Sequence, residues 1–307
     1  MGAGGSLLQL TWIDGQGKVA GTIGDKGAYG NPAVSPDGAH IAVTRFDPQK
    51  GNSNIWVFDT SRGTNTRLTF SAGRDDVAVW SPDSKRIVFA SNRNGHFDLY
   101  EKPADGSSEE RLLLKSDNDK RPTSWSRDGR HLIYSEIDPK TQEDLWVLPL
   151  PVSGYPEPAA QKPIPFLQTP FRETLARFSP DGRFVAYSSN ESGTFEVYVR
   201  PFSAEKIGES ASSGKWMVSK GGGGNPHWRA DGKELFYIYQ LQQWAVDVTT
   251  DKVFQAGIPK RLFNTPPIQT APDVAADGQR FLYVALEGTN NQTPFTIVLN
   301  WQAGLKK

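Results

Sequence analysis

A four-residue turn recurs along almost the whole chain, and it constrains the fold more than any other feature. Its full form is Ser179-Pro180-Asp181-Gly182, and related forms place an Asp at positions 37, 83, 128, 181, 231 and 277. The steps between these positions are 46, 45, 53, 50 and 46 residues. Asp-Gly favours a tight hairpin, because Gly accepts a positive φ and Asp can hydrogen-bond its own backbone. Six such turns with a period in the forties indicate a radial repeat architecture.

The segments between the turns alternate short apolar runs with polar breaks. In the second repeat, the runs at 77–80, 87–90, 97–100 and 110–114 are rich in β-branched, aromatic or Leu residues and are separated by Asp, Asn, Ser or Gly. This pattern predicts four antiparallel strands per repeat, which is the content of one propeller blade. We therefore expect an all-β fold, a six-bladed β-propeller of four-stranded antiparallel blades.

The two ends of the chain suggest how the ring closes. Leu7–Ile13 and Lys18–Ile23 resemble a third and a fourth strand with no first pair before them. The last Asp-Gly turn is followed by an apolar run at 280–285 and another at Phe295–Trp301. The simplest prediction is that the N-terminal strands complete the last blade. Because Leu7–Ile13 then competes with Phe295–Trp301 for one place, a seven-bladed parent stays open.

Chain length and composition fit one closed domain. The chain has 307 residues, and blades cannot bury their faces alone, so residues 7–307 are expected to form a single β-propeller domain. Residues 1–6 are too short and too polar for a signal peptide, and we interpret them as an artificial start or a linker. Long connections at Pro149–Gln161 and Pro201–Gly214 should leave the ring on the face of the Asp-Gly turns, and we expect them to be mobile.

Charge and cysteine content exclude several function classes. Basic and acidic residues number 34 each, so no broad basic surface is expected, which argues against nucleic acid or an anionic membrane as the main partner. No stretch is long and apolar enough to insert into a membrane. The chain has no Cys, which removes disulfides, thiol catalysis and Cys-ligated metals.

The motifs resemble those of a known family. The Ser-Pro-Asp-Gly turn, the run at residues 90–100 and Arg67-Leu68-Thr69 resemble TolB-type (WD40-like) β-propeller repeats over nearly the whole chain. The segments at 144–149, 196–202 and 297–301 further resemble propellers that follow Ser/Thr kinase domains in some bacterial proteins. The resemblance implies a bacterial, extracytoplasmic sensor or interaction module. The chain itself has no kinase glycine-rich loop, His-Arg-Asp or Asp-Phe-Gly motif, so no kinase activity follows.

No catalytic constellation stands out in the sequence. There is no Gly-x-Ser-x-Gly elbow, and the acidic loops at 75–76 and 117–119 lack the spacing of a calcium loop. Gly221–Gly224 is followed by no Lys-Ser/Thr, so it is interpreted as a flexible entry to a strand rather than a phosphate cradle. Trp80, Trp125 and Trp228 recur three residues before the turn Asp, which favours packing between blades over sugar stacking. We predict no catalytic residue, no metal and no cofactor.

Polar residues gather where each first strand begins, opposite the Asp-Gly turns, and this end should form the mouth of the central channel. A polar ring on one axis is the default place for a small ligand or a partner's tail. The predicted ligand-binding residues are Asn31, Asp76, Arg121, Arg172, Glu173, Arg177, Asn225, His227 and Asp273. The competing interpretation is a water-filled channel whose charges pair across blades.

The predicted function is a non-enzymatic binding or sensor module that takes a protein partner or a small ligand at the propeller axis. The alternative is a saccharide- or peptide-directed lyase or hydrolase. That activity would require Arg121, Arg177, His227 and either Glu173 or Asp273 to converge around a metal or a substrate.

Overall fold

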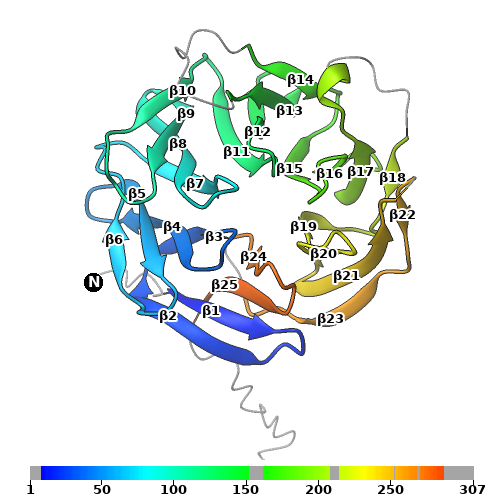
Figure 1. Ribbon diagram of the computed structural model, residues 1–307, viewed down its shortest axis with the longest axis horizontal. Helices are drawn as coiled ribbons and strands as arrows, with labels where there is room; N and C mark the ends of the chain where they lie inside the picture. Colours follow the sequence, from blue (N-terminus) through cyan, green and yellow to red (C-terminus); the bar gives the residue numbers. More distant parts are fainter. Residues whose placement is uncertain (1–7, 152–161, 208–213, 252, 268–269, 287–307) are drawn as a thin grey trace, which may run out of the picture.

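Six antiparallel sheets, five with four strands and one with an extra short outer strand, surround a central axis as the blades of a β-propeller (Figure 1). This computed structural model describes residues 8–151, 162–207, 214–251, 253–267 and 270–286. The prediction of an all-β, six-bladed propeller is confirmed. The only helical element among the described residues is a short 3-10 turn, η2 (Ala204–Lys206).

The first three blades follow the chain in order, and each begins with its innermost strand (Figure 1). Blade 1 contains β3 (Tyr29–Val34), β4 (His40–Asp47), β5 (Asn52–Asp59) and β6 (Asn65–Arg67). Blade 2 contains β7 (Asp75–Trp80), β8 (Arg86–Asn94), β9 (His96–Pro103) and β10 (Arg111–Leu114). Blade 3 contains β11 (Asp119–Trp125), β12 (His131–Asp138), β13 (Gln142–Pro149) and β14 (Ile164–Leu167).

The next two blades keep this order, with one addition at the outer edge. Blade 4 contains β15 (Glu173–Phe178), β16 (Phe184–Ser189), β17 (Glu196–Pro201) and β18 (Trp216–Met217). Blade 5 contains β19 (Gly224–Trp228), β20 (Glu234–Tyr239), β21 (Gln242–Thr249), β22 (Gln255–Ala256) and β23 (Lys260–Asn264). Both β22 and β23 pair with β21, so this blade has two short outer strands.

The sixth blade joins the two ends of the chain. Its strands are β24 (Asp273–Val274), β25 (Arg280–Leu286), β1 (Leu8–Asp14) and β2 (Val19–Gly27), in the order β2-β1-β25-β24. The predicted closure by N-terminal strands is therefore confirmed. The expected strand at Phe295–Trp301 lies outside the described residues, as do residues 152–161 and 208–213 of the two long connections.

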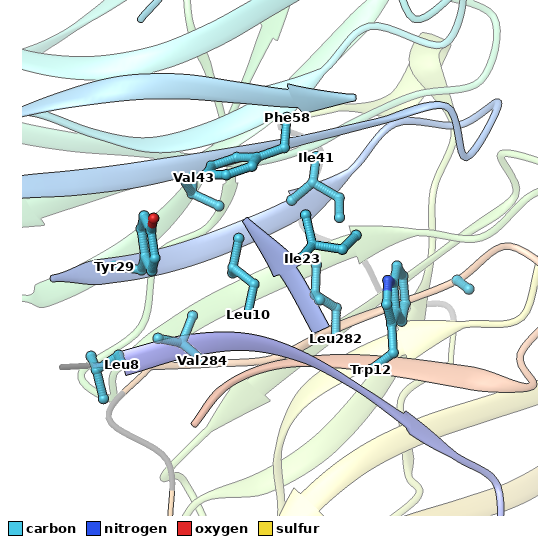
Figure 2. Close-up of a cluster of buried hydrophobic side chains, with 11 residues drawn as sticks. Leu8, Leu10, Trp12, Ile23, Tyr29, Ile41, Val43, Phe58, Leu282 and Val284 are labelled. Carbon is cyan, nitrogen blue, oxygen red and sulfur yellow. The ribbon is translucent and has the colours of Figure 1, made fainter. Parts of the chain in front are cut away.

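Closure depends on an apolar interface between blade 6 and blade 1 (Figure 2). Leu10 and Trp12 of β1 and Leu282 of β25 pack in one buried cluster with Ile41 of β4 and Phe58 of β5. Burial of large aliphatic and aromatic side chains is the main favourable term in folding. This cluster therefore holds blade 1 against blade 6, whose own strands come from both ends of the sequence.

The Asp-Gly turns connect the first two strands of every blade. In the fourth blade, Asp181 Oδ1 accepts hydrogen bonds from Ser179 Oγ at 2.6 Å and from the Arg183 backbone N–H at 3.1 Å. Gly182 has a φ of +72°, which suits a residue without a Cβ. Ser84, which replaces this Gly in the second blade, takes a φ of +59°. The turn Asp is thus a structural acceptor, as predicted.

The tryptophan row packs between blades, which confirms the expected core role. Trp80 and Trp125 are buried, and the Trp80 ring N–H donates to the carbonyl of Ala33 in blade 1 at 2.9 Å. Trp228 donates in the same way to the carbonyl of Arg177, at 3.1 Å. Each of these two side chains therefore connects its own inner strand to that of the preceding blade.

Candidate binding site in the central channel

A cavity of about 410 Å³ lies on the propeller axis. Residues from the innermost strand of every blade line it, from β3, β7, β11, β15, β19 and the segment around β24. Six of the nine predicted ligand-binding residues belong to this lining: Asn31, Arg121, Arg177, Asn225, His227 and Asp273. Their role in ligand binding remains a prediction.

The innermost strands carry an irregularity beside the cavity. In blades 1 to 5 the pairing register shifts within the first strand, as a β-bulge produces. The residue six positions before the turn Asp has a positive φ in four blades: Asn31 (+46°), Val77 (+52°), Leu175 (+54°) and Asn225 (+55°). Asn tolerates this region, whereas Val and Leu are strained in it. The fold thus stores backbone strain around the channel, as binding sites often do.

The position four residues before each turn Asp divides the channel wall into two halves. Blades 1, 2 and 3 place Ala33, Val79 and Ser124 there. Blades 4, 5 and 6 place Arg177, His227 and Asp273 at the same position. All of these residues line the cavity, so at this position blades 1 to 3 form an uncharged half of the wall and blades 4 to 6 a charged half. Arg121 and Glu143 of blade 3 are charged lining residues at other positions.

The three ionisable groups contact one another across blades 4, 5 and 6. His227 Nε2 lies 3.0 Å from Asp273 Oδ1 and 3.2 Å from Arg177 Nη2. His227 Nδ1 lies 3.2 Å from the carbonyl oxygen of Asn225, and Asp273 Oδ2 accepts the Val34 backbone N–H at 2.7 Å. Arg177 Nη1 also donates to the carbonyl of Thr123. The network therefore bridges blade 3 and blade 1 through the charged half of the wall.

Burial and charge act on this network in opposite directions. Burial alone would raise the pKa of Asp273, but the hydrogen bond and charge of His227, together with Arg177, hold that pKa below its usual range. Burial lowers the pKa of Arg177, and the charge of Asp273 opposes that effect. The charge of Asp273 thus compensates the half-buried Arg177, with His227 between them. Both imidazole nitrogens of His227 lie against neighbours, so neither is directed freely into the cavity.

Asp76 contacts a neighbouring blade rather than the cavity. Its Oδ1 accepts hydrogen bonds from Asn31 Nδ2 at 2.7 Å and from Thr44 Oγ1 at 2.8 Å, both in blade 1. The structure therefore brings Asp76 beside the mouth as the partner of a lining residue, Asn31. This pairing across blades is the arrangement expected from the competing interpretation of the polar ring.

Arg172 and Glu173 also lie outside the cavity lining. Arg172 forms an ion pair with Glu143 of blade 3, with Nη2 and Oε2 2.5 Å apart. Glu173 is buried, and its Oε1 accepts a hydrogen bond from Thr169 Oγ1. Burial raises the pKa of Glu173 to about 7; the bond from Thr169 opposes this, and the charges of Asp144 and Glu191 add to it. Glu173 thus belongs to the interface between blades 3 and 4.

Two lining residues, Arg121 and Asn225, have polar groups without an ion-pair or hydrogen-bond partner among the described residues. Arg121 is exposed and forms no ion pair with any other described residue. Asn225 is buried, and its Nδ2 donates to the Pro272 carbonyl at 3.2 Å, while its Oδ1 lacks a hydrogen-bond partner in the part of the chain that the structure describes. Among the described lining residues, Arg121 is therefore a cation left free at the mouth, whereas the unpaired oxygen of Asn225 is buried.

Glu143 is a lining residue that sequence reasoning missed. It begins the third strand of blade 3, next to Asp144, which belongs to a polar position repeated in several blades. Third strands start on the mouth face, so this adjacency is the signal that could have found it. Its charge is compensated by Arg172, which reaches it from blade 4.

Two kinds of feature are absent from the described residues, a cluster of three metal-ligating side chains and a membrane-spanning helix. Within the described ranges, no group of three or more His, Cys, Asp or Glu side chains is arranged to hold a common metal ion. Over the same residues, no helix has the length and apolarity that crossing a membrane requires.

Comparison with known sequences gives partial matches along the chain. Residues 10–146 match the family described as PD40, TolB beta propeller domain. A Tol-Pal system protein TolB from Wolinella succinogenes is 28% identical over 155 residues, which are 50% of this chain and 35% of that protein. The uncharacterized protein Atu1656 from Agrobacterium fabrum is 37% identical over 104 residues, 34% of each chain. The match thus spans about a third of the length of these curated relatives.

Solved structures share the fold at low sequence identity. A putative TolB from Agrobacterium tumefaciens has a TM-score of 0.67 and 14% identity, covering 92% of this chain and 99% of that one. An oligogalacturonate lyase in complex with manganese has a TM-score of 0.57 and 14% identity, covering 89% and 76%. At such identities the likeness concerns the fold alone. The comparisons therefore show TolB-like repeats in residues 10–146 and the fold of solved β-propellers over most of the chain.

Proposed function

We propose that this propeller is a non-enzymatic binding module that holds a protein partner at the mouth of its central channel. The supporting observation is the axial cavity, which all six inner strands line and whose wall combines strained backbone with the free cation of Arg121. Concave sites with a few convergent polar groups are the usual places for ligands. The TolB-like sequence matches favour an interaction module over a catalytic one.

The state of the ionisable residues supports the same proposal. Arg177, His227 and Asp273 are engaged with one another and with backbone groups. A general base must instead reach the proton that it removes from a substrate. The trio is therefore suited to shaping and polarising the wall, while Arg121 remains available to an acidic group of a partner.

A display library of random peptides, selected on the immobilised protein, tests the proposal. We expect selected peptides to carry an acidic residue and to lose about tenfold in affinity for an Arg121→Glu variant. The matched control is Arg62→Glu, an exposed Arg between β5 and β6 and outside the cavity lining, which should leave affinity unchanged. Peptides that bind the Arg121→Glu variant and the wild type equally would contradict a site at the mouth.

The second candidate is a saccharide-directed lyase. Its support is the convergence of Arg177, His227 and Asp273 in the cavity. The fold of the chain also resembles that of an oligogalacturonate lyase. Incubation with oligogalacturonate and Mn²⁺, followed by ultraviolet absorbance of the unsaturated product, tests it directly. If the wild type forms the product and the Asp273→Ala variant does not, the lyase function would replace the proposed binding function.

The cellular setting is part of the proposal. We infer a bacterial, extracytoplasmic sensor domain, with a kinase and a membrane segment encoded upstream, because of the TolB-like matches and the kinase-linked motifs at 144–149 and 196–202. Sequencing the gene around this segment tests it. A signal peptide without a kinase domain would overturn the kinase link and leave a periplasmic binding protein.

A further inference from the structure

Three interfaces between consecutive blades, from blade 1 to blade 4, each contain a buried polar slot built from equivalent positions. One member lies on the first strand, eight residues before the turn Asp, and the other is the third residue of the third strand of the preceding blade. The pairs are Asn54 with Asp75, Asp98 with Lys120, and Asp144 with Glu173. Because the three slots occupy equivalent positions, their charges can be compared directly.

The first two slots supply a positive charge to their carboxylate. Asp75 accepts bonds from Arg93 Nη2 at 3.2 Å, from Ser71 Oγ at 2.9 Å and from Asn54 Nδ2 at 3.3 Å. Asp98 lies 3.4 Å from Lys120 Nζ, and the two side chains are 1% and 0% exposed. A buried charge without such a partner is strongly destabilising.

The third slot, between blades 3 and 4, has carboxylates on both sides and no cation. Asp144 and Glu173 are 0% and 1% exposed. Thr141 Oγ1 donates to Asp144 Oδ2 at 2.6 Å, Gln168 Nε2 donates to the same oxygen at 3.4 Å, and Thr169 donates to Glu173 Oε1. Asp144 Oδ1 and Glu173 Oε2 are buried and lack a hydrogen-bond partner among the described residues.

Nearby basic groups do not compensate this pair. Arg172, next to Glu173 in the chain, forms its ion pair with Glu143, and Lys215 forms its own with Glu191. No Lys, Arg or His in the described ranges forms an ion pair with Asp144 or Glu173. Burial raises the pKa of both carboxyl groups, as expected for acids without a cation beside them.

We propose that the slot between blades 3 and 4 binds one Ca²⁺ ion through Asp144 and Glu173, in the place that the Lys120 ammonium occupies in the neighbouring slot. Carboxylate oxygens and the hydroxyl oxygens of Thr141 and Thr169 are the hard ligands that Ca²⁺ prefers, and the described residues of the slot include no His. The ion neutralises both carboxylates and fastens two blades together. This inference is independent of the proposed channel function.

Thermal unfolding of the purified chain tests the site, with equilibrium dialysis against Ca²⁺ for stoichiometry. We expect one Ca²⁺ per chain and a Tm about 5 °C higher in millimolar Ca²⁺ than in chelator. Glu173→Gln should fold and lose the bound ion and the shift. Glu173→Lys copies the neighbouring slot, so its Tm should be the same with Ca²⁺ and with chelator.

The control is Asp247→Asn, which removes an exposed carboxylate that pairs with Lys260, and it should keep the full Ca²⁺ response. Retention of the shift in Glu173→Gln, or its loss in Asp247→Asn, would overturn the site. A wild-type Tm that ignores Ca²⁺ but falls between pH 6 and pH 8 in chelator would also overturn it, and would assign neutralisation of the pair to a proton.

Discussion

The two halves of the channel wall share one backbone design and differ in chemistry. Four residues before the turn Asp, blades 1 to 3 carry Ala33, Val79 and Ser124, and blades 4 to 6 carry Arg177, His227 and Asp273. The strands are equivalent in pairing and in their turns. The propeller fold therefore does not depend on the identity of this residue, so the residue type at this position can vary between blades.

The difference shows where stability and function separate in a repeat protein. Positions that recur make structural contacts: the turn Asp closes the first hairpin of each blade, and the Trp of blades 2 and 5 bonds to the preceding blade. The position four residues before the turn Asp varies between blades. The ionisable groups that it carries in blades 4 to 6 compensate one another, so we expect mutation to be most damaging there.

The largest effect is expected for Asp273→Ala, because this change removes the carboxylate that pairs with His227 and compensates the charge of half-buried Arg177. Removing one member of such a partly buried charged network costs about 3 kcal/mol, which we expect in urea unfolding. The equivalent change in the uncharged half, Val79→Ala, should cost about 1–2 kcal/mol from lost apolar burial. Equal losses in the two halves would mean that the charged network contributes no special stability.

The acid pH dependence should distinguish the same two variants. The pKa of Asp273 is lowered in the folded state, so its ionised form stabilises the fold at pH values above the unfolded pKa, near 3.9. This contribution is lost as the pH falls through the lower folded pKa. Stability measured from pH 5 to pH 2 should therefore fall less steeply in Asp273→Ala than in the wild type or Val79→Ala. Parallel curves would show that Asp273 titrates normally.

A smaller effect is expected at the opposite end of the strands. Asp181→Ala removes the acceptor of the Ser179 and Arg183 bonds, which should cost about 1–2 kcal/mol and lower the Tm by about 2–4 °C. Peptide binding at 25 °C should be intact, since the turn lies away from the mouth. Lost binding in a folded Asp181→Ala variant would show that the turns take part in function.

The smallest effect concerns strain in the uncharged half. Val77 has a φ of +52° at the position that Asn occupies in blades 1 and 5. Val77→Asn should raise the free energy of unfolding by about 0.5–1 kcal/mol, because Asn tolerates this conformation better than a β-branched residue. Chemical denaturation of the two proteins measures it. A loss of stability would indicate that packing of the Val side chain outweighs the backbone strain.

Much of the fold could be predicted from the sequence because its cause is local and repeated. The spacing of Asp37, Asp83 and the later turn residues predicts the blades, and the unpaired strands at the N-terminus predict the closure that β1 and β25 make. The residues of the channel wall can be found from the same spacing, by counting back from each turn Asp. Arg177, His227 and Asp273 share one offset from their turns, so their convergence is a consequence of the repeat.

The loops at the mouth were less predictable. Asp76, Arg172 and Glu173 precede or begin first strands, yet they contact neighbouring blades instead of lining the cavity. Alternation along a strand does not fix their direction, because the register shifts within the first strands of blades 1 to 5. Glu143 was missed for a different reason: it lies on the third strand β13, and its contact at the mouth depends on the approach of Arg172 from the next blade.

The sequence by itself determined the propeller repeat, the hairpin role of Asp181 and its equivalents, and the residue type four positions before each turn Asp, but it left six and seven blades open. These follow from spacing, from turn chemistry and from residue type at a fixed offset. Only the tertiary structure decided which charges are compensated. It pairs Arg172 with Glu143, yet leaves Asp144 and Glu173 together without a cation. The physical reason is that burial and electrostatic pairing are set between blades, by residues far apart in the chain, whereas turns and strands are set within each repeat.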